Sequence, residues 1–309
     1  MEPFDPLFQN PHWQTIASHY WPRPPGLEDF PEQRRLIQTE PDVQVLVVSQ
    51  QPVGAARGDV VLVHGLEGTG DAGYMRSLAL AALRAGFAAH RFHLRTCGGT
   101  EHLCRTLYHA GLTSDLLAFL RTLDSAAFVV GFSLGGNVVL KLAGESGSTD
   151  ILRGVCGVSV PLDLGACARR IHEPDNWLYE RRFVERMKER LCATGRYRKA
   201  DFAGLRSVMD LDDKITAPSF GFGNAGNYYR TQSAIRFLPG IRVPCLLIQA
   251  KDDTFIPFDV YGSEAVRSNP CIEVLSTRYG GHLGFLARDR RQRFWVDRVI
   301  MNWILKRLI

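Results

Sequence analysis

Hydrophobic and polar positions alternate in short blocks along most of the chain, and these blocks predict strands separated by helices. Runs rich in Val, Leu, Ile and Phe are typical of buried strands. They occur at residues 43–49, 59–65, 87–94, 126–132, 154–160, 243–250 and 271–276. Between several runs the apolar residues recur at helical spacing, as at 74–86 and 112–123. Such alternation predicts an α/β fold with a mostly parallel central sheet and helices on both faces.

Two parts of the chain depart from this alternation. Residues 1–40 are rich in proline and aromatic residues, and we expect them to form an N-terminal arm that runs over the surface before the first strands. About 80 residues separate the strand ending near Val160 from the strand starting near Val243, far more than one crossover helix needs. We therefore expect one domain at 41–309 that carries a helical cap insertion at about 163–240.

The middle of the insertion, residues 174–195, predicts a long basic helix. Trp177, Val184, Met187 and Leu191 recur at helical spacing, and the pattern ends near Gly195. Residues 165–199 hold ten Lys and Arg against five Asp and Glu, a net charge of +5. This charge predicts either a solvated helix face or a basic cap that contacts anionic lipid or an acidic substrate.

Composition narrows the class of protein. With 309 residues, 45% of them hydrophobic, the chain can bury one large core. A net charge of +5 is too small for a nucleic-acid footprint, so no nucleic-acid partner is expected. An acidic, proline-containing start and the lack of any run of 18 apolar residues predict a soluble, non-secreted, cytoplasmic protein without a transmembrane segment. The seven cysteines are scattered and odd in number, which favours reduced thiols.

A cluster of histidines and cysteines between His93 and His109 invites a metal interpretation. The cluster has no Cys-x-x-Cys or His-x-x-x-His spacing, and His90 and His93 would point to opposite faces of a strand. We expect no metal site there and no cofactor.

The segment VVGFSLGGNVVL, residues 129–140, places a serine between glycines where a predicted strand gives way to a helix. Small neighbours allow a sharp strand-to-helix turn that exposes a serine hydroxyl beyond the sheet. Ser133 is therefore a candidate nucleophile, provided that partners lie at neighbouring strand ends, where ligands bind in open parallel sheets.

A glycine-rich loop with the sequence HGLEGTG follows the strand at 59–65. Such a loop can direct the backbone N–H of Leu66 at a developing oxyanion, and the N–H of Leu134, directly after Ser133, can supply a second donor. An alternative is that the loop is only a tight turn or a phosphate loop. It lacks the Lys-Ser/Thr ending of a nucleotide-binding P-loop, which argues against a nucleotide.

Two further strand ends supply an acid and a base. Asp252 and Asp253 follow the strand at 243–250, and we favour Asp253 as the acid because it begins an Asp-x-x-x-Pro turn; Asp252 and, more weakly, Asp163 remain alternatives. His282 follows the last strand in a glycine-rich loop. The chain order Ser133, Asp253, His282 is that of a hydrolase with a Ser-Asp-His catalytic triad.

These residues resemble the α/β-hydrolase fold, in the group of bacterial YheT and the eukaryotic ABHD esterases and lipases. NPHWQT at 10–15 is similar to that group's Asn-Pro-His-Leu-Gln-Thr signature, with Trp13 in the place of Leu. Further blocks similar to the group follow in the right order: HGLEG, LRTCGG, LYHAGLTSDL, GFSLGGN, FGNAGNYY, VPCLLIQAKDDTFIP and GGHLGF. Eukaryotic members of the group often carry an N-terminal membrane helix, and this sequence has no such segment.

The resemblance implies a serine carboxylester hydrolase with Ser133 as nucleophile, His282 as base and Asp253 orienting the base. The apolar, aromatic insertion favours an apolar, lipid-like ester as the small-molecule substrate. One alternative is an acyltransferase that passes the acyl group to an alcohol. A second is a catalytically silent scaffold that binds a ligand or a partner.

Overall fold

The computed structural model describes residues 3–147 and 150–308. Its strands form one eight-stranded sheet in the order β1-β2-β4-β3-β5-β6-β7-β8. β2 is antiparallel to both β1 and β4, and every other neighbouring pair is parallel. The predicted α/β class is thus confirmed. The strands are β1 (Gln33–Glu40), β2 (Val43–Gln50), β3 (Asp59–Val63), β4 (Ala88–Phe92), β5 (Ala127–Phe132), β6 (Leu152–Val158), β7 (Cys245–Ala250) and β8 (Ile272–Thr277).

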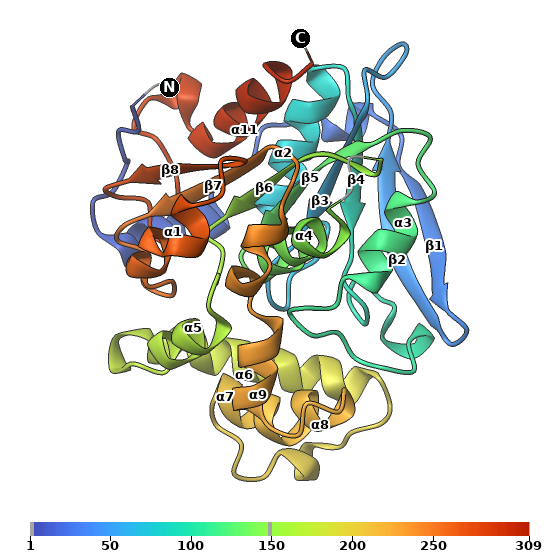
Figure 1. Ribbon diagram of the computed structural model, residues 1–309, viewed down its shortest axis with the longest axis vertical. Coiled ribbons are helices and arrows are strands. Elements are labelled where there is room, and N and C mark those ends of the chain that lie inside the picture. The colour runs from blue at the N-terminus through green and yellow to red at the C-terminus, as the bar shows by residue number, and fades with distance from the viewer. Residues whose placement is uncertain (1–2, 148–149, 309) are drawn as a thin grey trace.

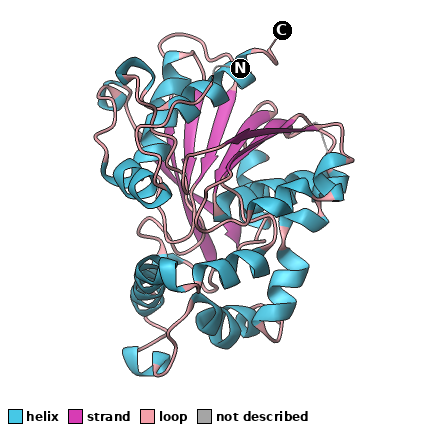
Figure 2. Cartoon of the chain, turned by 90° about the vertical axis from the view of Figure 1, so that its left-hand side faces the viewer, coloured by secondary structure: helices cyan, strands magenta, loops and turns pink. Residues whose placement is uncertain are grey.

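Helices cover both faces of the sheet (Figure 2). Alternate residues of a strand point to opposite faces, so Val61 of β3 joins the core on one face while Leu62 joins the core on the other. The first core includes α3 (Ser114–Leu120), α4 (Leu134–Ser146) and α10 (Glu264–Arg267); the second includes α2 (Gly73–Arg84) and α11 (Trp295–Leu305). The six parallel strands, β3 to β8, all run in the same direction, so their carboxyl ends lie at one edge of the sheet.

The chain between β6 and β7 forms a helical cap below this edge of the sheet (Figure 1). The cap has small cores of its own, one around Val184, Met187 and Leu191 and another around Tyr228 and Tyr229. Its helices are α5 (Leu164–Ile171), α6 (Trp177–Ala193), α7 (Val208–Leu211), α8 (Ala217–Ser219) and α9 (Ala225–Gln232). The cap therefore folds over the strand ends where the candidate residues were expected.

The N-terminal arm differs from the expectation. It contains a helix, α1 (Pro11–Tyr20), and the first strand of the sheet, β1, which already spans residues 33–40. The side chain of Asn10 caps α1 by accepting the N–H groups of His12 and Trp13. β1 has one exposed side, and its charged and polar residues did not produce a recognisable strand pattern in the sequence.

One position in the predicted cap helix is also corrected. Val184, Met187 and Leu191 are buried as expected, but Trp177, which the periodicity placed on the same face, is 56% exposed. Trp177 is the first residue of α6, directly after the short turn at Pro174–Asn176, and the core around Val184, Met187 and Leu191 does not include it.

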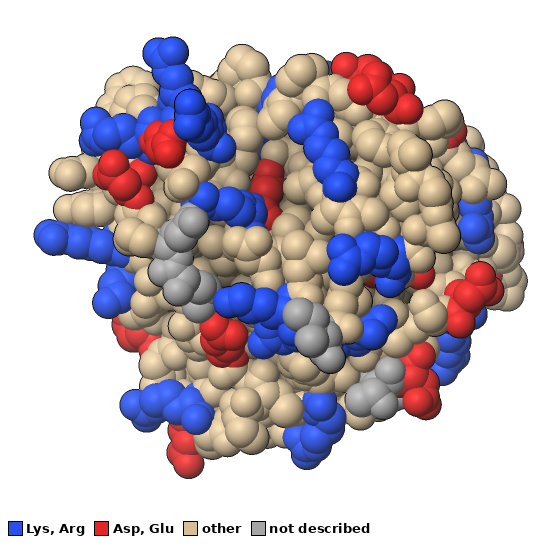
Figure 3. Space-filling model, turned by 90° about the horizontal axis from the view of Figure 1, so that it is seen from above, with Lys and Arg blue, Asp and Glu red and all other residues tan. Residues whose placement is uncertain are grey.

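Surface charge is dispersed on the face opposite the cap. Lys and Arg side chains lie there in separate groups with Asp and Glu among them (Figure 3). In the described part of the chain, no helix is long and apolar enough to cross a membrane. All seven cysteines are free thiols.

Candidate active site

Ser133 occupies a strained turn between β5 and α4. Its backbone has φ 50° and ψ −121°, a conformation that a non-glycine residue rarely adopts. The turn is closed so tightly that a Cβ on Gly131 would lie 2.5 Å from the Gly135 carbonyl oxygen. Glycines flank the serine because only a residue without a side chain permits this approach of strand and helix. The turn places the Ser133 side chain beyond the end of β5, where it lines a pocket.

We expect Gly135→Ala to destabilise the protein by about 3 kcal/mol, because overpacking in a rigid core has costs of this order. The added Cβ would meet the backbone oxygens of His64 and Val63 at 2.3 and 2.5 Å, and backbone cannot move aside as a side chain can. Urea unfolding would measure the loss. Gly262→Ala is the matched control, because a Cβ there meets nothing within 4 Å; equal losses in the two variants would contradict the argument.

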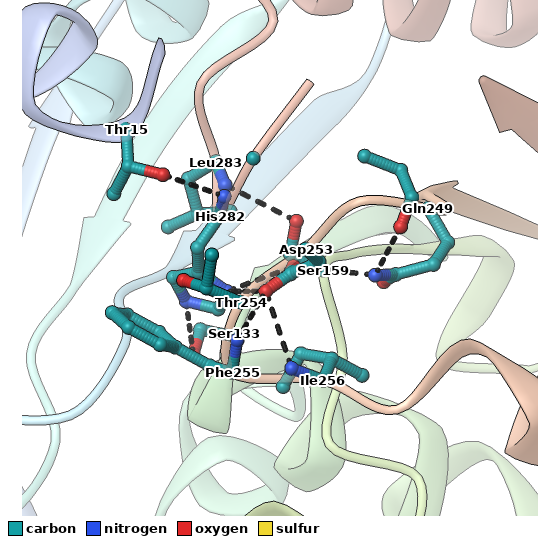
Figure 4. Close-up of polar contacts among 12 residues, drawn as sticks. Thr15, Ser133, Ser159, Gln249, Asp253, Thr254, Phe255, Ile256, His282 and Leu283 are labelled. Atoms are coloured by element: carbon teal, nitrogen blue, oxygen red, sulfur yellow. Dashed lines mark hydrogen bonds and ion pairs between the residues drawn. The ribbon is translucent and has the colours of Figure 1, made fainter. Parts of the chain in front are cut away.

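The structure brings Ser133, His282 and Asp253 together from three separate strand ends (Figure 4). His282 Nε2 lies 3.0 Å from Ser133 Oγ, and His282 Nδ1 lies 3.0 Å from Asp253 Oδ2. With the imidazole proton on Nδ1, held by the carboxylate, Nε2 is free to accept the serine proton. The Phe255 ring packs against the imidazole, with the ring centroids 4.5 Å apart. This arrangement can activate a serine hydroxyl.

Asp253 is held in place by its own loop. Its Oδ1 accepts the backbone N–H groups of Phe255 and Ile256, at 2.9 and 3.2 Å. Its Oδ2 accepts the side-chain amide of Gln249 at 3.2 Å, in addition to facing His282 (Figure 4). Because donors surround both oxygens, the carboxylate has one orientation toward the imidazole.

The two alternative acids occupy other places. Asp252 Oδ1 accepts the N–H of Gly281, so this carboxylate holds the backbone of the histidine loop and not the imidazole. Burial raises the pKa of Asp252. Asp163 caps the start of α5 by accepting the Ala166 N–H at 2.9 Å.

Helix α1 supports the histidine loop, a role that the sequence did not predict. The backbone N–H of His282 donates to Thr15 Oγ1 at 2.9 Å (Figure 4). The side chains of Gln14 and Ser18 donate to backbone carbonyls of the same loop, at 2.7 and 3.1 Å. The NPHWQT block was noted in the sequence only as a signature. Its threonine and glutamine turn out to position the segment that carries the base.

The loop after β3 presents one free donor beside Ser133. The Gly65 N–H donates to the hydroxyl of Tyr74 at 3.1 Å. The Glu67 N–H donates to the hydroxyl of Tyr108, also at 3.1 Å. Between them, the N–H of Leu66 has no protein acceptor within residues 3–147 and 150–308. Leu66 lines the pocket together with Ser133, so its N–H is available to a ligand there.

The second expected donor, the N–H of Leu134, belongs to the first residue of α4. The first N–H groups of a helix have no partner within the helix, and the helix dipole makes this end favourable for negative charge. A Cβ on Gly65 would lie 3.2 Å from the Ser133 Cβ, so the loop and the turn are in contact. The two predicted oxyanion donors therefore lie near Ser133, one in the loop after β3 and the other at the start of α4.

His64 fixes the conformation of the loop after β3. Its Nε2 accepts the N–H of Leu94 at 3.1 Å, and its Nδ1 lies 2.8 Å from the Gly65 carbonyl oxygen. These contacts place the proton on Nδ1. Burial lowers the pKa of His64 to about 3, so the ring stays neutral near neutral pH and keeps both hydrogen bonds.

A buried ion pair connects this loop to the cap. Arg190 of α6 donates through Nε to both carboxylate oxygens of Glu67, at 2.9 and 3.0 Å, and through Nη1 to Thr96 Oγ1. The side chains of Arg190 and Glu67 are 9% and 4% exposed. The guanidinium also lies over the Tyr108 ring, 4.6 Å from its centroid. Glu67 itself has φ 51°, so the pair holds a strained residue next to the Leu66 N–H.

We expect Glu67→Gln to reduce stability by about 3 kcal/mol, because it leaves the buried Arg190 charge uncompensated. The ester hydrolysis that the sequence leads us to expect should also fall, since the Leu66 N–H loses its support. Thermal and urea unfolding, with kcat at a temperature well below the transition, would measure both effects. The double variant Glu67→Gln/Arg190→Met should recover most of the stability, and a double variant no more stable than the single one would refute this explanation.

Two pockets meet at Ser133. The inner pocket, of about 740 Å³, extends into the cap and is lined mainly by apolar and aromatic residues. The outer pocket, of about 1410 Å³, extends between α1 and α6. The two share Leu66, Ser133, Phe183, Phe255 and His282.

His93 and His109, at the two ends of the histidine and cysteine cluster, make hydrogen-bond and packing contacts within the protein. His93 follows β4 and accepts the Gly70 N–H at Nε2, and burial lowers its pKa to about 4. His109 packs among aromatic rings of the cap, 4.5 Å from the centroid of Phe220. In the described ranges, no group of three or more His, Cys, Asp and Glu residues is arranged to hold a metal ion.

The chain is similar to known α/β hydrolases in both sequence and fold. The Alpha/beta hydrolase family matches residues 60–295. YheT of Escherichia coli (strain K12) is 30% identical over 96% of this chain and 91% of its own length. Phospholipase ABHD3 of Mus musculus is 28% identical over 81% of this chain, which spans only 64% of ABHD3. Among solved structures, the Pyrococcus furiosus esterase Pf2001 shares the fold, with a TM-score of 0.58 and 18% identity over 91% of this chain and 98% of its own.

Proposed function

The chain belongs to the α/β-hydrolase family, in the group of YheT and the ABHD-type esterases and lipases, and from this membership we propose that it is a serine carboxylester hydrolase for apolar acyl esters. The observation that carries the proposal is the line of contacts from Ser133 Oγ to His282 and on to Asp253, at 3.0 Å each, where an apolar pocket begins. It supports covalent catalysis through an acyl-enzyme.

In the first half of the reaction, His282 Nε2 takes the proton of Ser133 as Oγ attacks the ester carbonyl carbon. The new negative charge on the carbonyl oxygen is stabilised by the N–H groups of Leu66 and Leu134. Asp253 stabilises the imidazolium that forms. The bond from the acyl carbon to the alcohol oxygen then breaks, and His282 returns the proton to that oxygen as the alcohol leaves.

In the second half, water replaces the alcohol. His282 takes a proton from the water, the hydroxide attacks the acyl carbon, and the same two N–H groups hold the oxyanion. Ser133 leaves with the proton from His282, and a free carboxylic acid is released. An alcohol that takes the place of this water would yield a new ester, which is the acyl-transfer alternative.

The inner pocket favours an apolar acyl chain. Leu164, Ile171 and Val208 line it, and the apolar part of its lining greatly exceeds the polar part. Each methylene that leaves water stabilises the bound state by about 0.8 kcal/mol, which corresponds to about a fourfold rise in kcat/KM per added methylene until the pocket is full.

The test is a panel of p-nitrophenyl esters with acyl chains of graded length, run with and without ethanol. We expect kcat/KM to rise with chain length and then to level off, and the products should be mainly free acid. Predominant ethyl ester would favour the acyltransferase instead. A folded wild-type protein that neither cleaves any ester nor reacts with a fluorophosphonate would contradict both enzymes and favour the silent scaffold.

A further inference from the structure

The outer pocket opens to the surface between two helices that are far apart in the sequence. α1 and α6 are joined by a stack of His12 on Tyr179, with ring centroids 5.7 Å apart. They are also joined by Arg182, which donates to the Tyr20 hydroxyl at 3.2 Å. Ile16 and Tyr20 of α1 and Arg182 and Arg186 of α6 line this pocket, whose floor contains Ser133. Whatever enters the outer pocket thus passes between these helices.

The outward face of α1 carries large apolar side chains that are mostly exposed. Trp13, Ile16 and Tyr20 lie three and four positions apart, so they share one face of the helix. Trp13 is 63% exposed and Tyr20 67% exposed. Leu178, 61% exposed, lies one turn before Arg182 on α6. Other exposed large hydrophobic residues include Leu36 on β1, Val53 in a loop and Val274 on β8, which belong to separate elements.

The arginines beside this apolar face lack the acidic partners that neutralise their neighbours. Arg181 pairs with Glu185 at 2.8 Å, and Arg190 pairs with Glu67. By contrast, no carboxylate of the described residues pairs with Arg182 or Arg186, which lie four positions apart on one face. The carboxylates of the same pocket, Glu67 and Asp71, pair with Arg190 and Arg91, so the two positive charges of Arg182 and Arg186 favour a negatively charged ligand.

His19 of α1 lies beside Arg182 at the same pocket. Arg182 Nη2 lies 3.3 Å from His19 Nε2. Burial lowers the pKa of His19, and the positive charges of Arg182, Arg186 and Arg23 lower it further. His19, Arg23, Arg182 and Arg186 all line the outer pocket.

We propose that Trp13, Ile16 and Tyr20 of α1 and Leu178, Arg182 and Arg186 of α6 form a docking surface for an anionic lipid layer, which delivers a lipid ester through the outer pocket to Ser133. The delivery step rests on the function proposed above. Trp and Tyr side chains partition to the boundary between water and hydrocarbon, and arginines beside them bind anionic head groups. The lipid acyl chain then reaches the inner pocket, and its polar half stays in the outer one.

The test measures vesicle binding by Ser133→Ala, which cannot turn over the lipid. Sedimentation with vesicles of phosphatidylcholine and phosphatidylglycerol should retain the protein, and vesicles of phosphatidylcholine alone should retain much less. Adding Arg182→Gln and Arg186→Gln should weaken binding to the mixed vesicles about thirtyfold, at about 1 kcal/mol per arginine. Trp13→Ala should weaken binding to both kinds of vesicle.

Matched controls remove the same charge or apolar area elsewhere. Arg196→Gln/Arg198→Gln takes two positive charges from the exposed loop beyond the far end of α6, and Leu36→Ala truncates an exposed residue on β1. Neither control should change binding, and thermal unfolding would verify that every variant is folded. If the controls weakened vesicle binding as much as the test variants, the proposed docking surface would be wrong, because binding would depend only on overall charge and apolar area.

Three other outcomes are informative. Absence of vesicle binding, while wild type cleaves soluble p-nitrophenyl esters, would overturn the docking surface but not the proposed function. The protein could also prefer a soluble anionic ester to a neutral ester with the same acyl chain, without binding vesicles. This result would contradict docking on a lipid layer and would indicate that the arginines bind a small anionic substrate. Vesicle binding without any ester turnover by wild type would support the surface and contradict the hydrolase.

Discussion

Ser133→Ala is expected to lower kcat for a p-nitrophenyl ester by about 10⁵-fold or more, because no other group can form the acyl-enzyme. The loss should appear in kcat with little change in thermal stability. The Ser133 side chain makes one hydrogen bond, to His282, and an alanine tolerates the same backbone no worse than a serine.

The same variant should not react with a fluorophosphonate. Mass measurement of intact wild-type protein should show a single adduct, and Ser133→Ala should show none. Ser159→Ala is a matched control, because Ser159 also ends a strand with φ 50° and accepts the Leu283 N–H through its hydroxyl. An adduct that persists on Ser133→Ala and disappears on Ser159→Ala would show that Ser159, and not Ser133, is the nucleophile.

Asp253→Asn is expected to lower kcat by about 10³ to 10⁴-fold. The N–H groups of Phe255 and Ile256 require an acceptor at the Oδ1 position, so the amide oxygen is drawn there. The amide NH₂ then faces Nδ1 of His282 and favours the tautomer with its proton on Nε2. In that tautomer the imidazole cannot accept the serine proton.

Asp252→Asn provides the comparison within one loop. Its amide oxygen can still accept the Gly281 N–H, and its NH₂ replaces Oδ2, a buried oxygen without a partner in the described structure. Since burial already raises the pKa of Asp252, the loss of its charge should change kcat by less than about tenfold. A larger effect of Asp252→Asn than of Asp253→Asn would reverse the assignment of the acid. Both rates should be measured with urea unfolding, to separate chemistry from stability.

The two variants would test whether the adjacent acids have different roles. Asp253 faces the imidazole, and Asp252 ties the backbone of the histidine loop to the end of β7. An amide should therefore be tolerated at position 252 and not at position 253.

The amino-acid sequence by itself determined the strands from residue 43 onward and the strand ends where Ser133, Asp253 and His282 lie. Burial between two layers of helices imposes continuous apolar runs on parallel strands, and such runs are visible in one dimension. The glycines around Ser133 are visible for a similar reason, because a local backbone conformation requires them. The long interval before β7 likewise predicted a cap, and the structure has only helices and turns there.

Only the tertiary structure decided how distant segments support this site. The contact between Thr15 and His282 joins residues 267 positions apart, and the Glu67–Arg190 pair joins residues 123 positions apart. Neither pair lies within one helix or strand, so no periodicity relates them. The choice between the adjacent Asp252 and Asp253 likewise depended on the path of the loop after β7. Contacts of this kind arise because the sheet brings its strand ends to one edge, where α1 from the start of the chain and the cap from its middle then pack.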